Sequence, residues 1–103
     1  MDARIKTFAA EARQRFDFLL DAGFSEPLFH GPEGHPVVLT LTYARSGARV
    51  DVSLVLAHMG EEDVSTTLRT ATAHIETGPT TAHTAYQMRR ALDHQAAAIR
   101  MAL

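Results

Sequence analysis

Residues 37–56 read VVLTLTYARSGARVDVSLVL, two runs of nine residues in which large apolar side chains alternate with smaller or polar ones. A period of two is typical of strands that have one buried face. Between the runs, Ser46 and Gly47 fit the central positions of a tight turn, because glycine accepts the positive φ that such a turn requires. The stretch therefore predicts a β-hairpin.

A turn at Ser46 and Gly47 also predicts the register of the hairpin. Large apolar residues then meet on one face, in the pairs Tyr43–Val50, Leu41–Val52, Leu39–Leu54 and Val37–Leu56. A slip of one residue would expose half of these side chains to water. The opposite face is mostly polar, so we expect the sheet to be covered on one side only.

Length and composition limit the classes of protein to which this chain can belong. A chain of 103 residues is long enough for a single domain with one core. Its net charge of −2 gives no broad electrostatic reason to bind nucleic acid or an anionic membrane. The chain has no cysteine, no apolar run of membrane-spanning length and no recognisable signal peptide. We therefore expect a cytoplasmic protein that does not enter membranes.

Residues 2–22 carry apolar side chains at helical spacing, and Gly23 can end this first helix. Phe18 is the exception, because it projects opposite the apolar stripe at about 100° per residue. Two readings of Phe18 stay open: a single exposed aromatic that needs no explanation, or a contact with a partner.

Residues 24–36 are dense in glycine and proline and predict a loop, the middle of which can form a short edge strand. His30, Glu33 and His35 in this loop are the nearest approach to a set of metal ligands. They are three ligands at no recognised spacing, whereas a closed zinc site needs four. We therefore prefer a solvated loop and expect no cofactor.

Residues 63–70 fit both a strand and a helical stripe. Their β-branched threonines and the glycine at position 60 favour a strand after a short hairpin loop. Residues 72–78 then read as a connection, and Gly78-Pro79-Thr80-Thr81 as the start of a helix that runs to residue 103. The prediction is an α+β fold in two layers, αβββα, with helices covering one face of a three-stranded antiparallel meander.

The last helix is longer than the strands it covers, so its end is expected to overhang the sheet. Ile99, Met101 and Leu103 would then be free for a homodimer contact, with fraying of the last turn as the alternative. On the outer face of the sheet, Thr40, Thr42, Ser53 and Thr67 form either an ordinary solvated surface or a recognition surface.

Residues 16–56 contain a pattern of structural residues, Phe16-x-Phe18-Leu19-x-x-x-Gly23-Phe24 followed by Leu41-Thr42-Tyr43-x-x-Ser46-Gly47-x-x-Val50-x-Val52. It resembles that of small bacterial αβββα proteins, many of them uncharacterised and some of them immunity proteins of polymorphic toxin systems. The resemblance implies a protein partner and carries no functional residue to this chain. The order of elements is also similar to that of YbaB-like nucleoid-associated proteins, whose sequence motifs are missing here.

No phosphate-binding loop, nucleophile elbow or metalloprotease motif is present. The sequence therefore favours a non-catalytic protein-binding module of immunity or adaptor type. One alternative is an enzyme or small-molecule binder, with a pocket between the sheet and the 24–36 loop that involves His30, Glu33, His35 and Tyr43. A second is DNA binding through Arg89, Arg90 and Arg100, which the net charge disfavours.

Overall fold

The central hairpin forms with the predicted register. In the computed structural model, which describes residues 3–57 and 60–103, β2 (Val37–Arg45) pairs with β3 (Ala48–Leu56). Leu41 lies opposite Val52 along this ladder. Gly47 in the turn has a φ of +78°, as a tight turn between these strands requires.

The antiparallel sheet has five strands, so the prediction of three was wrong. β1 (Leu28–Glu33), β4 (Glu62–Thr70) and β5 (His74–Ala82) join the hairpin in the order β1-β2-β3-β4-β5. β4 confirms that residues 63–70 form a strand. β1 occupies the middle of the predicted loop, and β5 occupies the predicted connection and the predicted start of the last helix.

Both additional strands are edge strands that contain Gly-Pro, which explains why the sequence suggested breaks there. In β5, Val64 pairs with Thr80 but Thr66 pairs with Thr77, so the strand has an extra residue around Gly78 and Pro79. β1 has a similar irregularity at residues 31–32. An edge strand tolerates proline because the donor that proline lacks is not needed by a second neighbour.

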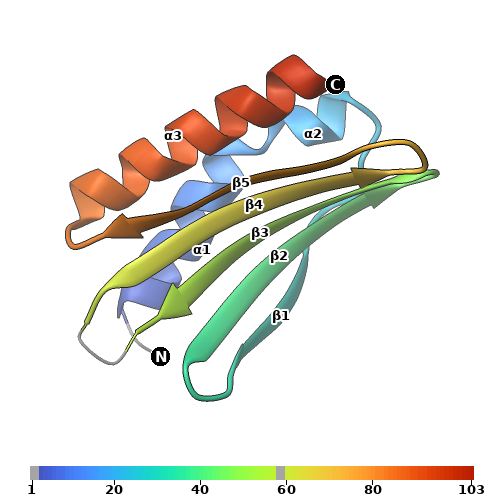
Figure 1. Cartoon of the computed structure of the whole chain (residues 1–103). Coiled ribbons are helices and arrows are strands. Elements are labelled where there is room, and N and C mark those ends of the chain that lie inside the picture. Colours follow the sequence, from blue (N-terminus) through green and yellow to red (C-terminus); the bar gives the residue numbers. More distant parts are fainter. Residues whose placement is uncertain (1–2, 58–59) are drawn as a thin grey trace.

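The helices α1 (Ala3–Arg15), α2 (Phe18–Asp21) and α3 (Ala85–Ala102) all lie on one face of the sheet (Figure 1). A turn at residues 16–17 divides the predicted first helix into α1 and α2. The predicted two-layer α+β arrangement, with a helix at each end of the chain and one face covered, is therefore confirmed. Of the helices in the described residues, none combines the length and the apolar character needed to cross a membrane.

α3 begins later than predicted because its N-terminus is fixed at Thr84. The Thr84 hydroxyl accepts a hydrogen bond from the Gln87 N–H at 3.1 Å, and Gln87 Oε1 accepts one from the His83 N–H at 2.7 Å. Thr84-x-x-Gln87 is a capping-box sequence, which satisfies backbone donors at a helix start. The helix thus starts at this sequence signal, six residues after Gly78.

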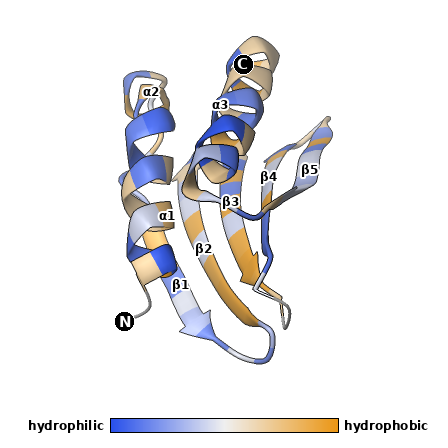
Figure 2. Cartoon of the chain, turned by 90° about the vertical axis from the view of Figure 1, so that its left-hand side faces the viewer, coloured by the Kyte–Doolittle hydropathy of each residue, from blue (hydrophilic) through white to orange (hydrophobic). Residues whose placement is uncertain are grey.

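The core lies between the helices and the inner face of the sheet. Figure 2 shows hydrophobic residues concentrated on β2 and β3 beneath the helices. The buried side chains include Phe8, Phe16, Leu41, Val52 and Leu92. The apolar pattern of the hairpin therefore supplies the floor of the core, and one stripe from each long helix closes it.

One polar side chain, Gln95, lies in the apolar stripe of α3 and is buried at the irregular part of the β4–β5 ladder. Its Nε2 donates to the Val64 carbonyl at 2.8 Å and lies 3.3 Å from Thr80 Oγ1. Its Oε1 accepts from the Thr66 hydroxyl at 2.8 Å. The amide thus satisfies buried polar groups where the strand pairing shifts.

Candidate binding surfaces

Within residues 3–57 and 60–103, no helix covers the face of the sheet opposite α1, α2 and α3, and we call this face the outer face (Figure 1). Strand pairing places Thr42, Asp51 and Thr67 in one row across it, and Thr40 and Ser53 in the next. The four sheet residues nominated from the sequence, Thr40, Thr42, Ser53 and Thr67, therefore share one face of the sheet, where Thr42 is only 7% exposed.

Side chains on the outer face are held by hydrogen bonds to one another. Thr40 Oγ1 and Ser53 Oγ lie 2.9 Å apart, and the Thr42 hydroxyl donates to Asp51 Oδ1 at 2.6 Å. The Arg49 guanidinium donates to the other oxygen of Asp51 at 2.9 Å. The two cross-strand links and the Arg49–Asp51 contact within β3 hold these side chains in fixed rotamers.

The outer face also carries charge and some apolar area. Asp51, Asp63 and Glu76 lie on it, against Arg49 and Arg69. Val38 pairs with Val55 on the same face, and Leu28, opposite Thr42, is 65% exposed. The surface is thus mildly acidic, with a small apolar component next to the β1 edge.

Phe18 does not belong to this surface. It lies on the helix side, where its ring is 6.0 Å from that of Phe16 and packs against the core. The Arg100 guanidinium lies 4.4 Å from the ring centroid of Phe18. The turn at residues 16–17 makes this packing possible, because an unbroken helix would direct Phe18 away from the core.

The apolar end of α3 is smaller than predicted. Ile99 is fully buried in the core, so it cannot supply the predicted homodimer contact. Met101 is 88% exposed and Leu103 is 44% exposed. The surface available for a contact between copies at this end is reduced to those two side chains.

The proposed pocket at residues 24–36 does not form as expected, since its members lie on opposite faces of the sheet. His30 pairs with Thr40 on the outer face, whereas Tyr43 pairs with Val50 on the inner face. Burial in the core raises the pKa of Tyr43 to about 12. His30, Glu33 and His35 do not converge either: within residues 3–57 and 60–103, no three potential metal-ligating side chains of this kind form a cluster.

The three arginines considered for DNA binding are separated by the packing of α3. Arg89 Nε donates to Glu11 Oε1 on α1 at 3.2 Å, and Arg100 covers Phe18. Arg90 lies on the other side of α3, with its guanidinium 5.9 Å from the ring centroid of Tyr86. These residues therefore do not form one basic patch.

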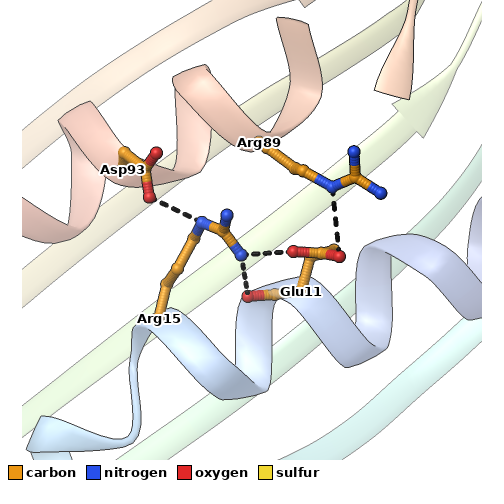
Figure 3. A network of polar contacts seen from close by, with 4 residues as sticks. All are labelled: Glu11, Arg15, Arg89 and Asp93. Carbon is orange, nitrogen blue, oxygen red and sulfur yellow. Dashed lines mark hydrogen bonds and ion pairs between the residues drawn. The ribbon is translucent and has the colours of Figure 1, made fainter. Parts of the chain in front are cut away.

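Arg89 belongs to a network that joins α1 to α3 (Figure 3). Arg15 contacts Glu11 on its own helix and donates from Nε to Asp93 Oδ1 at 2.6 Å. Partial burial raises the pKa of Glu11, but hydrogen bonds from Arg89 and Arg15, and their charges, outweigh this effect and lower the pKa below 4.5. The network is a structural link between helices.

A groove of about 430 Å³ separates α3 from the edge strand β5. Tyr86, Arg90 and His94 lie along its α3 side, one turn apart, and Thr80 and Thr81 lie along its β5 side. We call it the β5 groove. Sequence reasoning missed it because residues 80–81 were assigned to the helix, although the spacing of Tyr86, Arg90 and His94 was readable.

Two smaller hollows lie at other contacts of the helices. One, of about 390 Å³, lies between α1 and α3 beside Arg15 and Asp93. Another, of about 230 Å³, lies where α1 and α3 begin and is lined by Arg4, Glu62 and His83. Glu62 is buried there, with its Oε1 4.0 Å from Arg4 Nε. Arg15 and Asp93 in the first hollow, and Arg4 and Glu62 in the second, thus form ion pairs within the fold.

No family model, curated protein or solved structure matches this chain. Its resemblance to small αβββα proteins therefore stays a prediction, and the two further strands depart from that order of elements.

Proposed function

We propose that this chain is a non-catalytic protein-binding module, of immunity or adaptor type, whose partner docks on the outer face. The observation that carries the proposal is the sheet face away from the helices, on which Thr40, Ser53 and Thr67 are partly exposed and Thr42, in the same row as Thr67, is 7% exposed. Antiparallel sheets commonly leave one face to solvent, and such a face can also recognise other molecules.

Two properties of the outer face suit a protein partner. Its side chains already bond to one another, as Thr42 does to Asp51, so little rotamer entropy is lost when a partner orders them. It offers a broad surface with exposed Leu28 at its margin, whereas a small molecule would require a concave site.

The charge of the outer face favours a partner with a basic surface. Asp51, Asp63 and Glu76 face Arg49 and Arg69 there, and the whole chain has a net charge of −2. Complementary charge speeds association and excludes wrong partners more than it adds affinity. The partner is therefore expected to associate more slowly as the salt concentration rises.

The test compares one substitution on each side of the molecule. Ser53→Arg places a long cationic side chain in the middle of the outer face, and Ala10→Arg places the same side chain on the exposed side of α1. Both variants are first checked for wild-type unfolding in urea. Wild type, Ser53→Arg and Ala10→Arg are then used to capture proteins from an extract of the native host.

We expect the extract to contain a protein that is retained in equal amounts by wild type and by Ala10→Arg. Ser53→Arg should retain at least ten times less of it. Titration of the purified captured protein with wild type and with Ser53→Arg should give the same difference in affinity. The affinity for wild type should fall as the salt concentration rises. Equal retention by Ser53→Arg, or a captured protein that binds only through the helix side, would contradict the proposal.

A further inference from the structure

The β5 groove has a composition that points to a ligand with carboxylates. Its lining consists of threonine, tyrosine, glutamine, arginine, alanine and histidine side chains, with no acid among them. Arg90 makes no ion pair within residues 3–57 and 60–103, whereas Arg89, the residue before it, is bound to Glu11. The groove therefore has a positive charge that the described part of the fold does not neutralise.

Arg90 is also held in place. Its guanidinium lies over the Tyr86 ring and donates to the Tyr86 hydroxyl at 3.4 Å. Tyr86 is 64% exposed, an unusual position for an aromatic side chain that serves only the core. Tyrosine and arginine are the residue types that most often dominate binding interfaces.

The spacing of the groove matches an extended chain. Tyr86, Arg90 and His94 follow one another every four residues on α3, a rise of about 6 Å per step. Alternate residues of an extended chain are about 6.7 Å apart and point to the same side. Two side chains separated by one residue can therefore meet Arg90 and His94 together.

We propose that the β5 groove binds an extended segment of a partner protein through two carboxylates separated by one residue, one at Arg90 and the other at His94. Side chains supply the recognition. Strand addition to β5 is disfavoured, because Pro79 has no N–H to offer an added strand and the strand is irregular at that point. The groove and the outer face meet at Thr81, which lines the groove and donates its hydroxyl to Asp63 Oδ1 at 2.8 Å, but Arg90 and His94 lie on α3, away from the outer face.

The experiment uses the full chain labelled with ¹⁵N and two short capped peptides of identical composition. In one peptide two glutamates are separated by a threonine, and in its isomer they are adjacent. We expect saturable shifts of the amide signals of residues 80–94 with the first peptide, and at least threefold weaker binding of the isomer. Free glutamate should bind more weakly than either peptide.

Arg90→Ala should weaken binding of the first peptide about tenfold, the loss typical of a charge-assisted hydrogen bond. Arg69→Ala, which removes an exposed arginine from β4, should leave binding unchanged. Arg90→Lys keeps the charge but loses the planar fork, so intermediate affinity is expected. Equal binding of the two peptides or of free glutamate, or an unchanged affinity in Arg90→Ala, would overturn the proposal.

The expected binding of the peptides in the β5 groove does not depend on whether a partner docks on the outer face. The peptides test the groove directly, so Ser53→Arg should bind them like wild type. Loss of peptide binding in Ser53→Arg would show that the peptides need the outer face and would also overturn the groove proposal. Failure of the capture experiment alone would leave the peptide result intact.

Discussion

Gln95 shows how one buried residue can be required by an irregularity elsewhere in the fold. Replacing it by leucine keeps most of the volume but leaves the Val64 carbonyl and the Thr66 hydroxyl without their partner. We expect Gln95→Leu to lower the free energy of unfolding by about 2–4 kcal/mol, since each buried unsatisfied group costs about 1–3 kcal/mol.

Urea unfolding monitored by circular dichroism would measure this loss. Gln14→Leu, on the exposed side of α1, is the matched control and should change stability by less than about 0.5 kcal/mol. Adding Thr66→Val to Gln95→Leu should restore part of the loss, because one orphaned group is then removed. Equal stability of Gln95→Leu and wild type would contradict the role assigned to the amide.

Glu11 makes the stability of the α1–α3 contact depend on pH. Its pKa is lower in the folded chain than the usual 4.5, so its contribution is present above about pH 4.5 and is lost as the pH falls through the folded value. We expect Glu11→Gln to cost about 1 kcal/mol at pH 7 and progressively less below pH 4.5.

The control for Glu11 is Glu26→Gln. Glu26 also meets an arginine, Arg13, at 3.3 Å, but both side chains are largely exposed, so the substitution should have little effect at either pH. Denaturation in urea at a series of pH values would separate the two. A cost of Glu11→Gln that stays constant from pH 7 to pH 3 would exclude the proposed linkage.

Among the elements, β1 depends on a close approach that only glycine permits. A Cβ on Gly31 would lie 2.3 Å from the Val38 carbonyl oxygen, whereas one on Gly47 would meet nothing within 4 Å. Both residues have positive φ, so both alanine variants carry the same conformational cost of about 1–2 kcal/mol.

We therefore expect Gly31→Ala to destabilise the chain by at least about 1 kcal/mol more than Gly47→Ala, because β1 must also move away from β2. Hydrogen exchange should show the extra loss in the amides of residues 37–42. If the two variants unfolded at the same urea concentration, the close packing at Gly31 would be of no consequence to stability.

The elements differ in how far their sequences predict them. The hairpin was predictable to the register, because alternating apolar residues and the Ser46-Gly47 turn indicate the same pairing. β5 was not, since Gly78-Pro79 is a typical break and only the neighbouring strand makes an irregular edge strand stable there. The start of α3 was readable from Thr84-x-x-Gln87, a stronger signal than the Gly-Pro that was used.

The candidate surfaces also differ in whether the local sequence predicts them. The outer face was predictable because it depends only on the alternation in β2, β3 and β4. The β5 groove was not, because it requires knowing that residues 80–81 lie beside α3 as a strand. The pairing of Arg89 with Glu11 likewise joins residues far apart in the chain, and no local pattern signals it.

For the whole molecule, burial of Ile99 bears on the number of copies that associate. Met101 and Leu103 alone offer far less than the roughly 800 Å² per partner of a typical stable interface. We expect sedimentation equilibrium to give a monomer of 11.3 kDa. A doubled mass that returns to 11.3 kDa in Met101→Glu would instead support the homodimer predicted from the sequence.

The Gly-Pro irregularities at both outer strands have a consequence at high protein concentration. Long, regular margins would let molecules join side by side into continuous ribbons, the route by which sheets grow into fibrils. Here neither margin is regular, at residues 31–32 or at residues 78–79. Crowded copies of this chain should therefore stay dispersed and not polymerise.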